Sequence, residues 1–258
     1  MAETRDPEHG SGYTMRGLQG RVIEGIGRAI IRGDYAPGEL VPKEAELTEA
    51  YGVSRTSVRE AMRVLAAKGL VDIRQKIGTR VRRTEQWNVF DADILRWHSD
   101  EGRGESILRD LVEVRQIMEP QAARLAAGRA SMEDLRKLET ALSAMRAATT
   151  DRESYAHADV DFHVAVYGAS HNVLLRQFGA VIADFMYLSF SVQQQTASGE
   201  EVFAGDVEQH AAVLHAIHRG RGEQAAEAML DVVLDGKTAL IQALSGSRGD
   251  GSHGDTVT

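Results

Sequence analysis

The sequence predicts a mainly α-helical protein that contains one small β-hairpin. Apolar residues recur every three or four positions over most of the chain, which is the period of an amphipathic helix. Two short β-prone runs flank a turn near residue 76, and after Glu105 no strand-like alternation is found. We therefore expect an N-terminal winged helix-turn-helix with a small hairpin wing, followed by a C-terminal all-α helical bundle.

Composition sets the broad class. The 258 residues suffice for about two domains, and 43% of them are hydrophobic, so a sizeable core can form. Cysteine is absent, which excludes disulfides and leaves His and carboxylates as metal ligands. No apolar run approaches the roughly 18 residues of a membrane-spanning helix, and the N-terminus is charged rather than signal-like. We expect a soluble, cytoplasmic protein with no membrane partner.

The net charge of −8 is unevenly distributed. Residues 14–84 carry 14 Lys/Arg and 8 Asp/Glu, whereas residues 85–258 carry 15 Lys/Arg and 27 Asp/Glu. A small basic module followed by a large acidic one is typical of a protein that binds DNA with one end only.

The first elements form a helix-turn-helix pattern. Residues 1–13 are polar and aperiodic, so a disordered tail is expected. A helix to about Arg32 is marked by apolar residues at helical spacing: Leu18, Val22, Ile26 and Ile30. A second short helix begins after Pro42 and ends at Gly52, and a third begins at Ser54 only a few residues later. This close coupling of two helices predicts a helix-turn-helix.

The third helix has the residues that the major groove of DNA requires. Ser54 can cap its N-terminus, and an apolar seam follows at helical spacing, made of Val58, Met62 and Leu65. Donor side chains lie on the opposite, early side: Arg55, Thr56, Ser57 and Arg59. An ordinary amphipathic surface helix explains this stretch alone equally well. The flanking helix and hairpin favour DNA binding.

A basic hairpin follows the third helix. Residues 69–74 and 79–82 read as two strands around the turn 75–78. A hairpin in this position is a wing, and we expect Gln75 and Lys76 at its tip to contact phosphates or the neighbouring minor groove.

The second half of the chain reads as helices throughout. Residues 85–98 are predicted to be a linker, with both tryptophans packed between the domains as structural support or as a route for signals. Helices are expected at 104–129, 131–147, 151–168, 172–195, 206–219 and 221–243. The predicted domains are thus 14–84 and 99–244, with a disordered tail over 245–258.

The combined motifs resemble a known family. The run G-x-x-V-P-x-E-x-E-L, then Y-G-V-S-R-T-S-V-R-E-A-M, then K-G-L-V, is similar to the winged helix of the GntR superfamily of bacterial transcription regulators over residues 14–84. The resemblance implies that Arg55 and Arg59 contact operator DNA in a homodimer. One departure is Ala45, because many members of the FadR subfamily have an arginine there. The bundle resembles the FCD domain of that subfamily, and the run L-V-E-V-R-Q-I-M-E-P is most similar to its galactonate-responsive repressors.

One residue pair in the bundle could bind metal. Asp159 and His163 are four residues apart, so they share one helix face and could chelate a divalent ion. Such pairs are also common as surface groups or hydrogen-bonded core residues. The family resemblance adds His210 as a third ligand and implies a histidine 22 residues later, where this chain has Val232. Either the metal is lost, or three protein ligands leave an open position; we favour one Zn²⁺, Ni²⁺ or Mn²⁺ per chain.

The resemblance also implies that Arg115 faces the pocket and binds an acidic effector. A guanidinium suits a carboxylate, although Arg115 could instead form a surface salt bridge with Glu119 or Glu113. The expected function is a DNA-binding repressor of a catabolic operon, controlled by a carboxylate such as galactonate bound beside the metal. A metal-responsive regulator is the alternative. A metal-dependent enzyme using the same Asp/His/His set is less favoured, because no nucleophile and base pair accompanies it.

Overall fold

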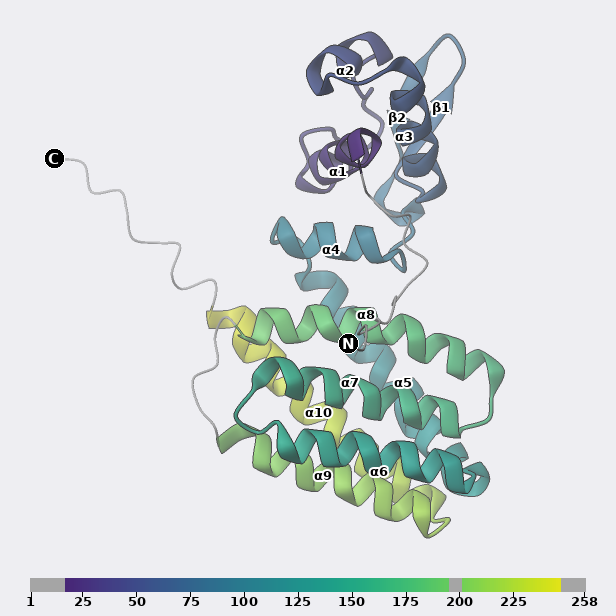
Figure 1. Ribbon diagram of the computed structural model, residues 1–258, viewed down its shortest axis with the longest axis vertical. Helices are drawn as coiled ribbons and strands as arrows, with labels where there is room; N and C mark the ends of the chain where they lie inside the picture. The colour runs from purple at the N-terminus through teal and green to yellow at the C-terminus, as the bar shows by residue number, and fades with distance from the viewer. Residues whose placement is uncertain (1–16, 195–200, 247–258) are drawn as a thin grey trace, which may run out of the picture. The chain divides into compact units, whose positions relative to one another are not determined.

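The computed structural model describes residues 17–194 and 201–246. The chain forms two compact units, Met1–Gly104 and Glu105–Thr258, and each is considered by itself (Figure 1). The predicted tail 1–13 lies outside the described residues, as do residues 247–258 of the predicted C-terminal tail, whereas residues 245–246 end the last helix. The mainly α-helical fold class with one antiparallel hairpin is confirmed.

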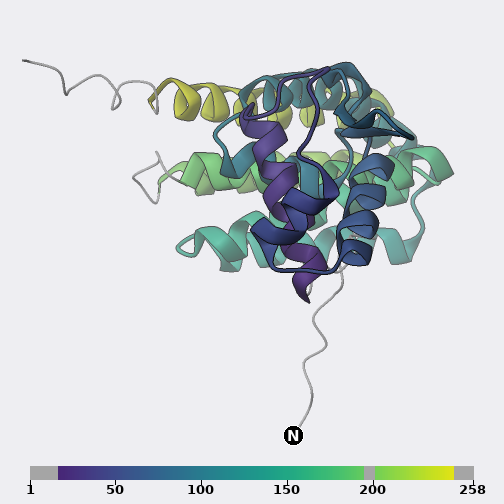
Figure 2. The same ribbon diagram turned by 90° about the horizontal axis from the view of Figure 1, so that it is seen from above.

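Three helices form the helix-turn-helix of the first unit: α1 (Gly17–Arg32), α2 (Glu44–Tyr51) and α3 (Arg55–Ala67), with α3 packed against both others (Figure 2). Gly52 ends α2 in the left-handed region with φ of 63°, which a residue without Cβ adopts at little cost. Ser54 then caps α3, and its side chain accepts a hydrogen bond from the Ser57 amide at 3.1 Å. The turn between the helices is short because both ends carry their own caps.

The wing is an antiparallel pair of strands, β1 (Val71–Arg74) and β2 (Gly78–Val81), in register from Val71 opposite Val81 to Arg74 opposite Gly78. The segment before α2 lies along the free side of β2, where the Val41 amide donates to the Thr79 carbonyl at 2.9 Å. Val71 and Val81 are buried in the core of this unit, which fixes the base of the hairpin.

The segment predicted to be a linker is folded onto the first unit. It contains a 3₁₀ turn (Thr84–Gln86) and helix α4 (Ala92–Asp100), capped by Asp91. Trp97 is fully buried in the core formed by α1 and α3, and it lies so close to Gly27 that any larger residue there would collide with the indole. Trp87 packs against the same core. The tryptophans therefore contribute to the core of the first unit, which differs from the packing between domains that we expected from the sequence.

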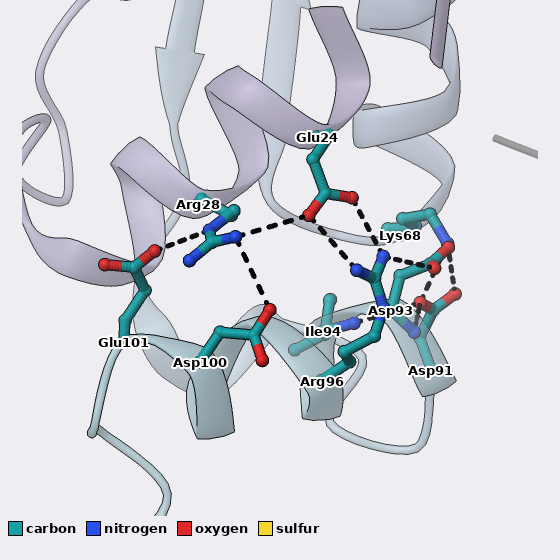
Figure 3. A network of polar contacts seen from close by, with 9 residues as sticks. All are labelled: Glu24, Arg28, Lys68, Asp91, Asp93, Ile94, Arg96, Asp100 and Glu101. Carbon is teal, nitrogen blue, oxygen red and sulfur yellow. Dashed lines mark hydrogen bonds and ion pairs between the residues drawn. The ribbon is translucent and has the colours of Figure 1, made fainter. Parts of the chain in front are cut away.

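Ion pairs fasten α4 to the helix-turn-helix (Figure 3). The Lys68 Nζ at the end of α3 lies 2.8 Å from Asp91 Oδ1 and 2.6 Å from Asp93 Oδ2. Its side chain is only 7% exposed. Further pairs connect α4 and the residue after it to α1: Arg96 with Glu24, Arg28 with Asp100, and Arg28 and Arg32 with Glu101. Helix α4 is thus an integral part of the first unit.

The second unit is an all-α bundle. Its helices are α5 (Glu105–Arg129), α6 (Met132–Ala147), α7 (Arg152–Ala169), α8 (Val173–Gln194), α9 (Glu201–His218) and α10 (Gly222–Gly246). Helix α5 packs against α7, α8, α9 and α10 and so occupies the middle of the bundle. Ser131 and Asp151 cap α6 and α7 with side-chain oxygens, so these helices begin at sites that local chemistry defines.

Helix α8 differs from the sequence-based expectation. By length and composition, Val173–Phe190 could cross a membrane, with a mean hydropathy of 1.3, although we expected no such stretch. In the bundle α8 packs against α7 and α10 and buries Ile182, Phe185 and Met186. Only 39% of this stretch is buried in the bundle, and Val173 and Leu174 at its start are exposed.

Candidate functional site

The start of α3 presents the residues predicted to contact DNA. Arg55, Thr56 and Arg59 are exposed, and Ser57 is partly buried where its amide and hydroxyl bind Ser54. The opposite face of the helix is buried, with Val58, Ala61, Met62 and Leu65 in the core. The helix therefore presents two guanidiniums on its free side while packing fixes its direction, as a recognition helix requires.

Arg59 is held in place by a carboxylate of the preceding helix. Its Nε lies 2.9 Å from Oε1 and 3.0 Å from Oε2 of Glu44, at the first residue of α2. This contact raises the pKa of Arg59 through the hydrogen bond to Glu44. The contact with Glu44 thus orients the guanidinium. Ala45, the position at which many FadR-subfamily members have an arginine, is exposed. Nothing in the sequence pattern indicated this pairing.

The wing tip is also exposed. Gln75, Lys76 and Ile77 form the turn, and Lys76 has a left-handed backbone with φ of 66°. Exposed polar side chains at the end of a hairpin can reach phosphates, so the geometry is compatible with the predicted contacts of Gln75 and Lys76. These contacts remain predictions.

The bundle brings Asp159, His163 and His210 together. Asp159 and His163 lie one turn apart on α7, and His210 comes from α9. His210 Nε2 is 3.0 Å from Asp159 Oδ1 and 3.4 Å from His163 Nε2, and His163 Nε2 is 3.8 Å from Asp159 Oδ1. All three residues are buried. Three donor atoms at such separations surround a point that one cation could occupy.

The outer ring nitrogens of both histidines lie against oxygen atoms, at ion-pair distance for His163 and in a hydrogen bond for His210. Nδ1 of His163 lies 2.7 Å from Glu119 Oε2, and Nδ1 of His210 donates to the Asp206 carbonyl at 2.7 Å. With the proton held on Nδ1, each Nε2 lone pair is directed to the centre of the cluster. A carboxylate or carbonyl behind a ligating histidine is the usual arrangement of metal sites, so the residues present fit a divalent cation.

Closely packed opposite charges shift the pKa values of the groups in and around the cluster. Burial by itself would raise the pKa of Glu119, but Arg115 and His163 outweigh it and hold that pKa at about 2. Burial would lower the pKa of His210, and the carboxylates of Asp159 and Asp206 instead raise it to about 10. Without a bound cation the cluster thus favours a proton on His210, and a metal ion would have to displace it.

A cavity of about 270 Å³ opens beside the cluster. It is lined by residues of α5, α7, α8, α9 and α10, among them Arg115 and Val232. Arg115 is buried, and its Nε lies 2.7 Å from Glu119 Oε1. The ion pair with Glu119 thus exists, but inside the bundle rather than on its surface. Val232 is buried at the edge of the cavity and cannot coordinate, so the three donors have one open side.

The other histidines of the described residues have different partners. The His98 ring lies 6.0 Å from the Trp87 ring at a tilt of 46°, His157 lies 3.1 Å from the Tyr187 hydroxyl, and His171 lies 2.8 Å from Asp134 Oδ2. His215 and His218 are exposed on α9. His9 and His253 lie outside the part of the chain that the structure describes.

Sequence reasoning missed two groups that shape the site. Glu119 was considered only as a salt-bridge partner of Arg115, although it also contacts His163. Asp206 was not considered, yet its carbonyl orients His210 and its carboxylate binds the Tyr155 hydroxyl. The spacing of four residues between Arg115 and Glu119, and between Asp206 and His210, was the available signal.

Comparison with known proteins identifies the family of both parts of the chain. Residues 18–81 match the gntR family of bacterial regulatory proteins, and residues 110–234 match the FCD domain. The galactonate operon transcriptional repressor of Escherichia coli (strain K12) is 35% identical over 214 residues, which are 83% of this chain and 92% of that protein. The Glc operon transcriptional activator of the same organism is 33% identical over 174 residues, 65% of this chain and 66% of that protein.

A solved structure shares the fold. Lar, which controls the expression of the Listeria monocytogenes agr system, superposes with a TM-score of 0.59 and 21% identity, covering 88% of this chain and 97% of that one. The matched gntR family and the galactonate operon repressor are transcriptional regulators and not enzymes, so the enzymatic alternative is set aside. The chain belongs to the gntR family of bacterial regulatory proteins and carries a C-terminal FCD domain.

Proposed function

We propose that this transcriptional regulator is a repressor of a sugar-acid catabolic operon, acting as a cytoplasmic homodimer whose FCD domain binds an aldonate beside a divalent metal. The observation that carries the proposal is the convergence of Asp159, His163 and His210 on a cavity that also contains Arg115. The 35% identity to a galactonate operon repressor supports both the repressor role and the class of effector.

In this proposal the first unit binds one operator half-site. Arg55 and Arg59 contact base edges, Thr56 and Ser57 contact phosphates or bases, and Gln75 and Lys76 contact the backbone from the wing. The exposure of the two arginines and the orientation of Arg59 by Glu44 support these roles. A single winged helix covers few base pairs, so a C₂ dimer that binds two half-sites supplies the remaining affinity.

The metal site would hold one ion per chain. Nitrogen and oxygen donors without thiolate suit Zn²⁺, Ni²⁺ or Mn²⁺, and availability selects among them. The bound ion would supply a Lewis-acidic position that accepts a carboxylate or hydroxyl oxygen. Val232 leaves this position open, whereas a fourth histidine would compete with the effector for it.

The effector would be a compact hydroxy acid. The cavity of about 270 Å³ lies near the lower end of small-molecule sites, which begin at about 300 Å³, and this favours a sugar acid over a large acyl thioester. Arg115 would bind its carboxylate with charge-assisted hydrogen bonds. Because five helices line the cavity, the ligand would favour one packing of the bundle, and a coupling of about 1–3 kcal/mol would change operator affinity 5–150-fold.

The test combines metal analysis with operator binding. Protein purified without chelator should contain about one metal ion per chain, and His210→Ala should lose it, whereas His215→Ala on the exposed face of the same helix should keep it. Galactonate should raise the melting temperature and weaken binding to an operator fragment that the protein has selected from random DNA.

Two outcomes would change the proposal. If lactate shifts the melting temperature and galactonate does not, the sugar-acid class is wrong. If added metal alone changes operator affinity and neither acid does, the protein is a metal-responsive regulator.

A further inference from the structure

One buried carboxylate connects the metal cluster to the anion-binding arginine. Glu119 is 1% exposed, and its carboxylate contacts partners on two helices. Oε2 lies 2.7 Å from His163 Nδ1 on α7, and Oε1 lies 2.7 Å from Arg115 Nε on α5 itself. Neither partner can change its position without affecting the contact that the same carboxylate makes with the other.

The contact with His163 decides which ring nitrogen faces the cluster. An ionised carboxylate has no proton to donate, so at the ion-pair distance of 2.7 Å it favours the ring form with the proton on Nδ1 and the lone pair on Nε2. That lone pair is directed toward Asp159 and His210. A carboxylate in this position also holds the orientation of the ring, which favours metal ligation.

The far end of the Arg115 guanidinium makes a contact of its own with the cluster. Arg115 Nη2 lies 3.3 Å from His163 Nε2, the lone pair that a metal ion would require. Cation and guanidinium therefore compete for one acceptor and repel each other at short range. When His163 gives this lone pair to an ion, Nη2 keeps only its contact of 3.4 Å with Glu119 Oε2, while Nε stays bound to Glu119 Oε1. The N–H groups of Nη2 then become available to an acceptor in the adjacent cavity.

We propose that Glu119 is a positioning residue that makes the affinity for the carboxylate effector depend on metal occupancy. The inference rests on the proposed metal and effector site. Glu119 fixes His163 for ligation and retains Arg115 at the cavity, and metal binding releases the Nη2 group of Arg115 from His163 so that it can bind an anion. Metal loading precedes effector binding in this scheme, because the empty cluster occupies the arginine.

Glu119→Gln tests this role, since an amide has nearly the same shape but one donor end. If its oxygen accepts from His163, its NH₂ group faces the Arg115 donors; if its oxygen accepts from Arg115, its NH₂ group faces Nδ1 and favours the ring form that cannot ligate through Nε2. Either orientation loses one contact. Glu113→Gln, on the exposed face of α5, is the matched control.

The experiment measures the affinity of full-length, metal-free protein for Zn²⁺ by competition with a chromophoric chelator, and for galactonate with and without saturating Zn²⁺. Glu119→Gln should weaken Zn²⁺ binding about 10–100-fold and weaken galactonate binding at saturating Zn²⁺, while Glu113→Gln matches the wild type. Arg115→Met should bind Zn²⁺ more tightly than the wild type and lose galactonate binding. Opposite shifts of Zn²⁺ affinity in these two variants are not expected if both residues merely stabilise the bundle.

The outcomes separate the inference from the proposed function. A wild type that binds Zn²⁺ and galactonate, with Glu119→Gln unchanged or Arg115→Met weaker for Zn²⁺, overturns the role of Glu119 and leaves the proposed function standing. A wild type that binds no Zn²⁺, Ni²⁺ or Mn²⁺ overturns both. If Glu119→Gln does not fold, the Zn²⁺ affinity of Arg115→Met and the dependence of wild-type galactonate binding on Zn²⁺ decide the matter.

Discussion

Replacing Lys68 by methionine should destabilise the DNA-binding unit. The Lys68 ammonium is nearly buried and is the shared partner of Asp91 and Asp93, so its removal leaves two carboxylates without this cation. Removing one partner of a buried ion pair costs about 3–5 kcal/mol. The two aspartates are 21% and 13% exposed, Asp93 keeps Arg96, and Asp91 still caps α4. We therefore expect a loss of about 2–3 kcal/mol, somewhat below that range.

Intrinsic tryptophan fluorescence measures this loss selectively. Both tryptophans of the chain, Trp87 and Trp97, pack against the core of the first unit, so their emission during urea titration reports unfolding of that unit. Lys76→Met, at the exposed wing tip, is the control for loss of a positive charge and should leave the midpoint unchanged. A loss below about 0.5 kcal/mol in Lys68→Met would place the pair among ordinary surface salt bridges and refute the argument.

Three further results are expected. Arg59→Ala should weaken specific operator binding by about 1–3 kcal/mol without changing the melting temperature. If this variant binds the operator as tightly as the wild type, α3 is not part of the DNA interface. Burial would raise the pKa of Asp134, but hydrogen bonds from Ser131 and the contact with His171 hold it at about 2. Since the folded-state pKa is below the unfolded one, the stabilisation that ionised Asp134 provides is complete above about pH 4 and should disappear between about pH 4 and pH 2. Acid titration monitored by circular dichroism tests this, with Ser131→Ala as the comparison. Asp235 lines the cavity one helical turn after Val232. Asp235→Asn should weaken galactonate binding about fivefold in calorimetry, which corresponds to the loss of one hydrogen bond from a sugar hydroxyl. Lactate binding should be unchanged in the same variant.

The winged helix was predictable because its signals are local. The cap at Ser54, the left-handed Gly52 and the apolar seam of α3 depend on residues within one or two turns of each other. The helices of the bundle were predictable for the same reason, and Ser131 and Asp151 start α6 and α7 close to the expected positions.

Contacts between distant segments were not predictable from the sequence. Helix α4 has only nine residues, and its place is set by the fit of Trp97 to Gly27, which are 70 positions apart. The interaction of Glu119 with His163 joins α5 to α7, and no spacing rule relates residues on different helices. Asp159 and His163 could be found by helical periodicity, whereas His210 and Arg115 were inferred from the family resemblance alone.

Because α4 is bound to the first unit, the flexible linker between the two units is short. As a free coil, residues 85–104 would have a root-mean-square reach of about 25 Å. Ion pairs from α1 hold Glu101, and the Arg103 guanidinium donates to the Arg32 carbonyl at 2.9 Å. The segment left to join the units is residues 102–104, which extend at most about 11 Å. The direct connection between the units therefore has less than half the reach of the free coil, and we expect the proposed dimer to bind more weakly to an operator with a few base pairs inserted between its half-sites.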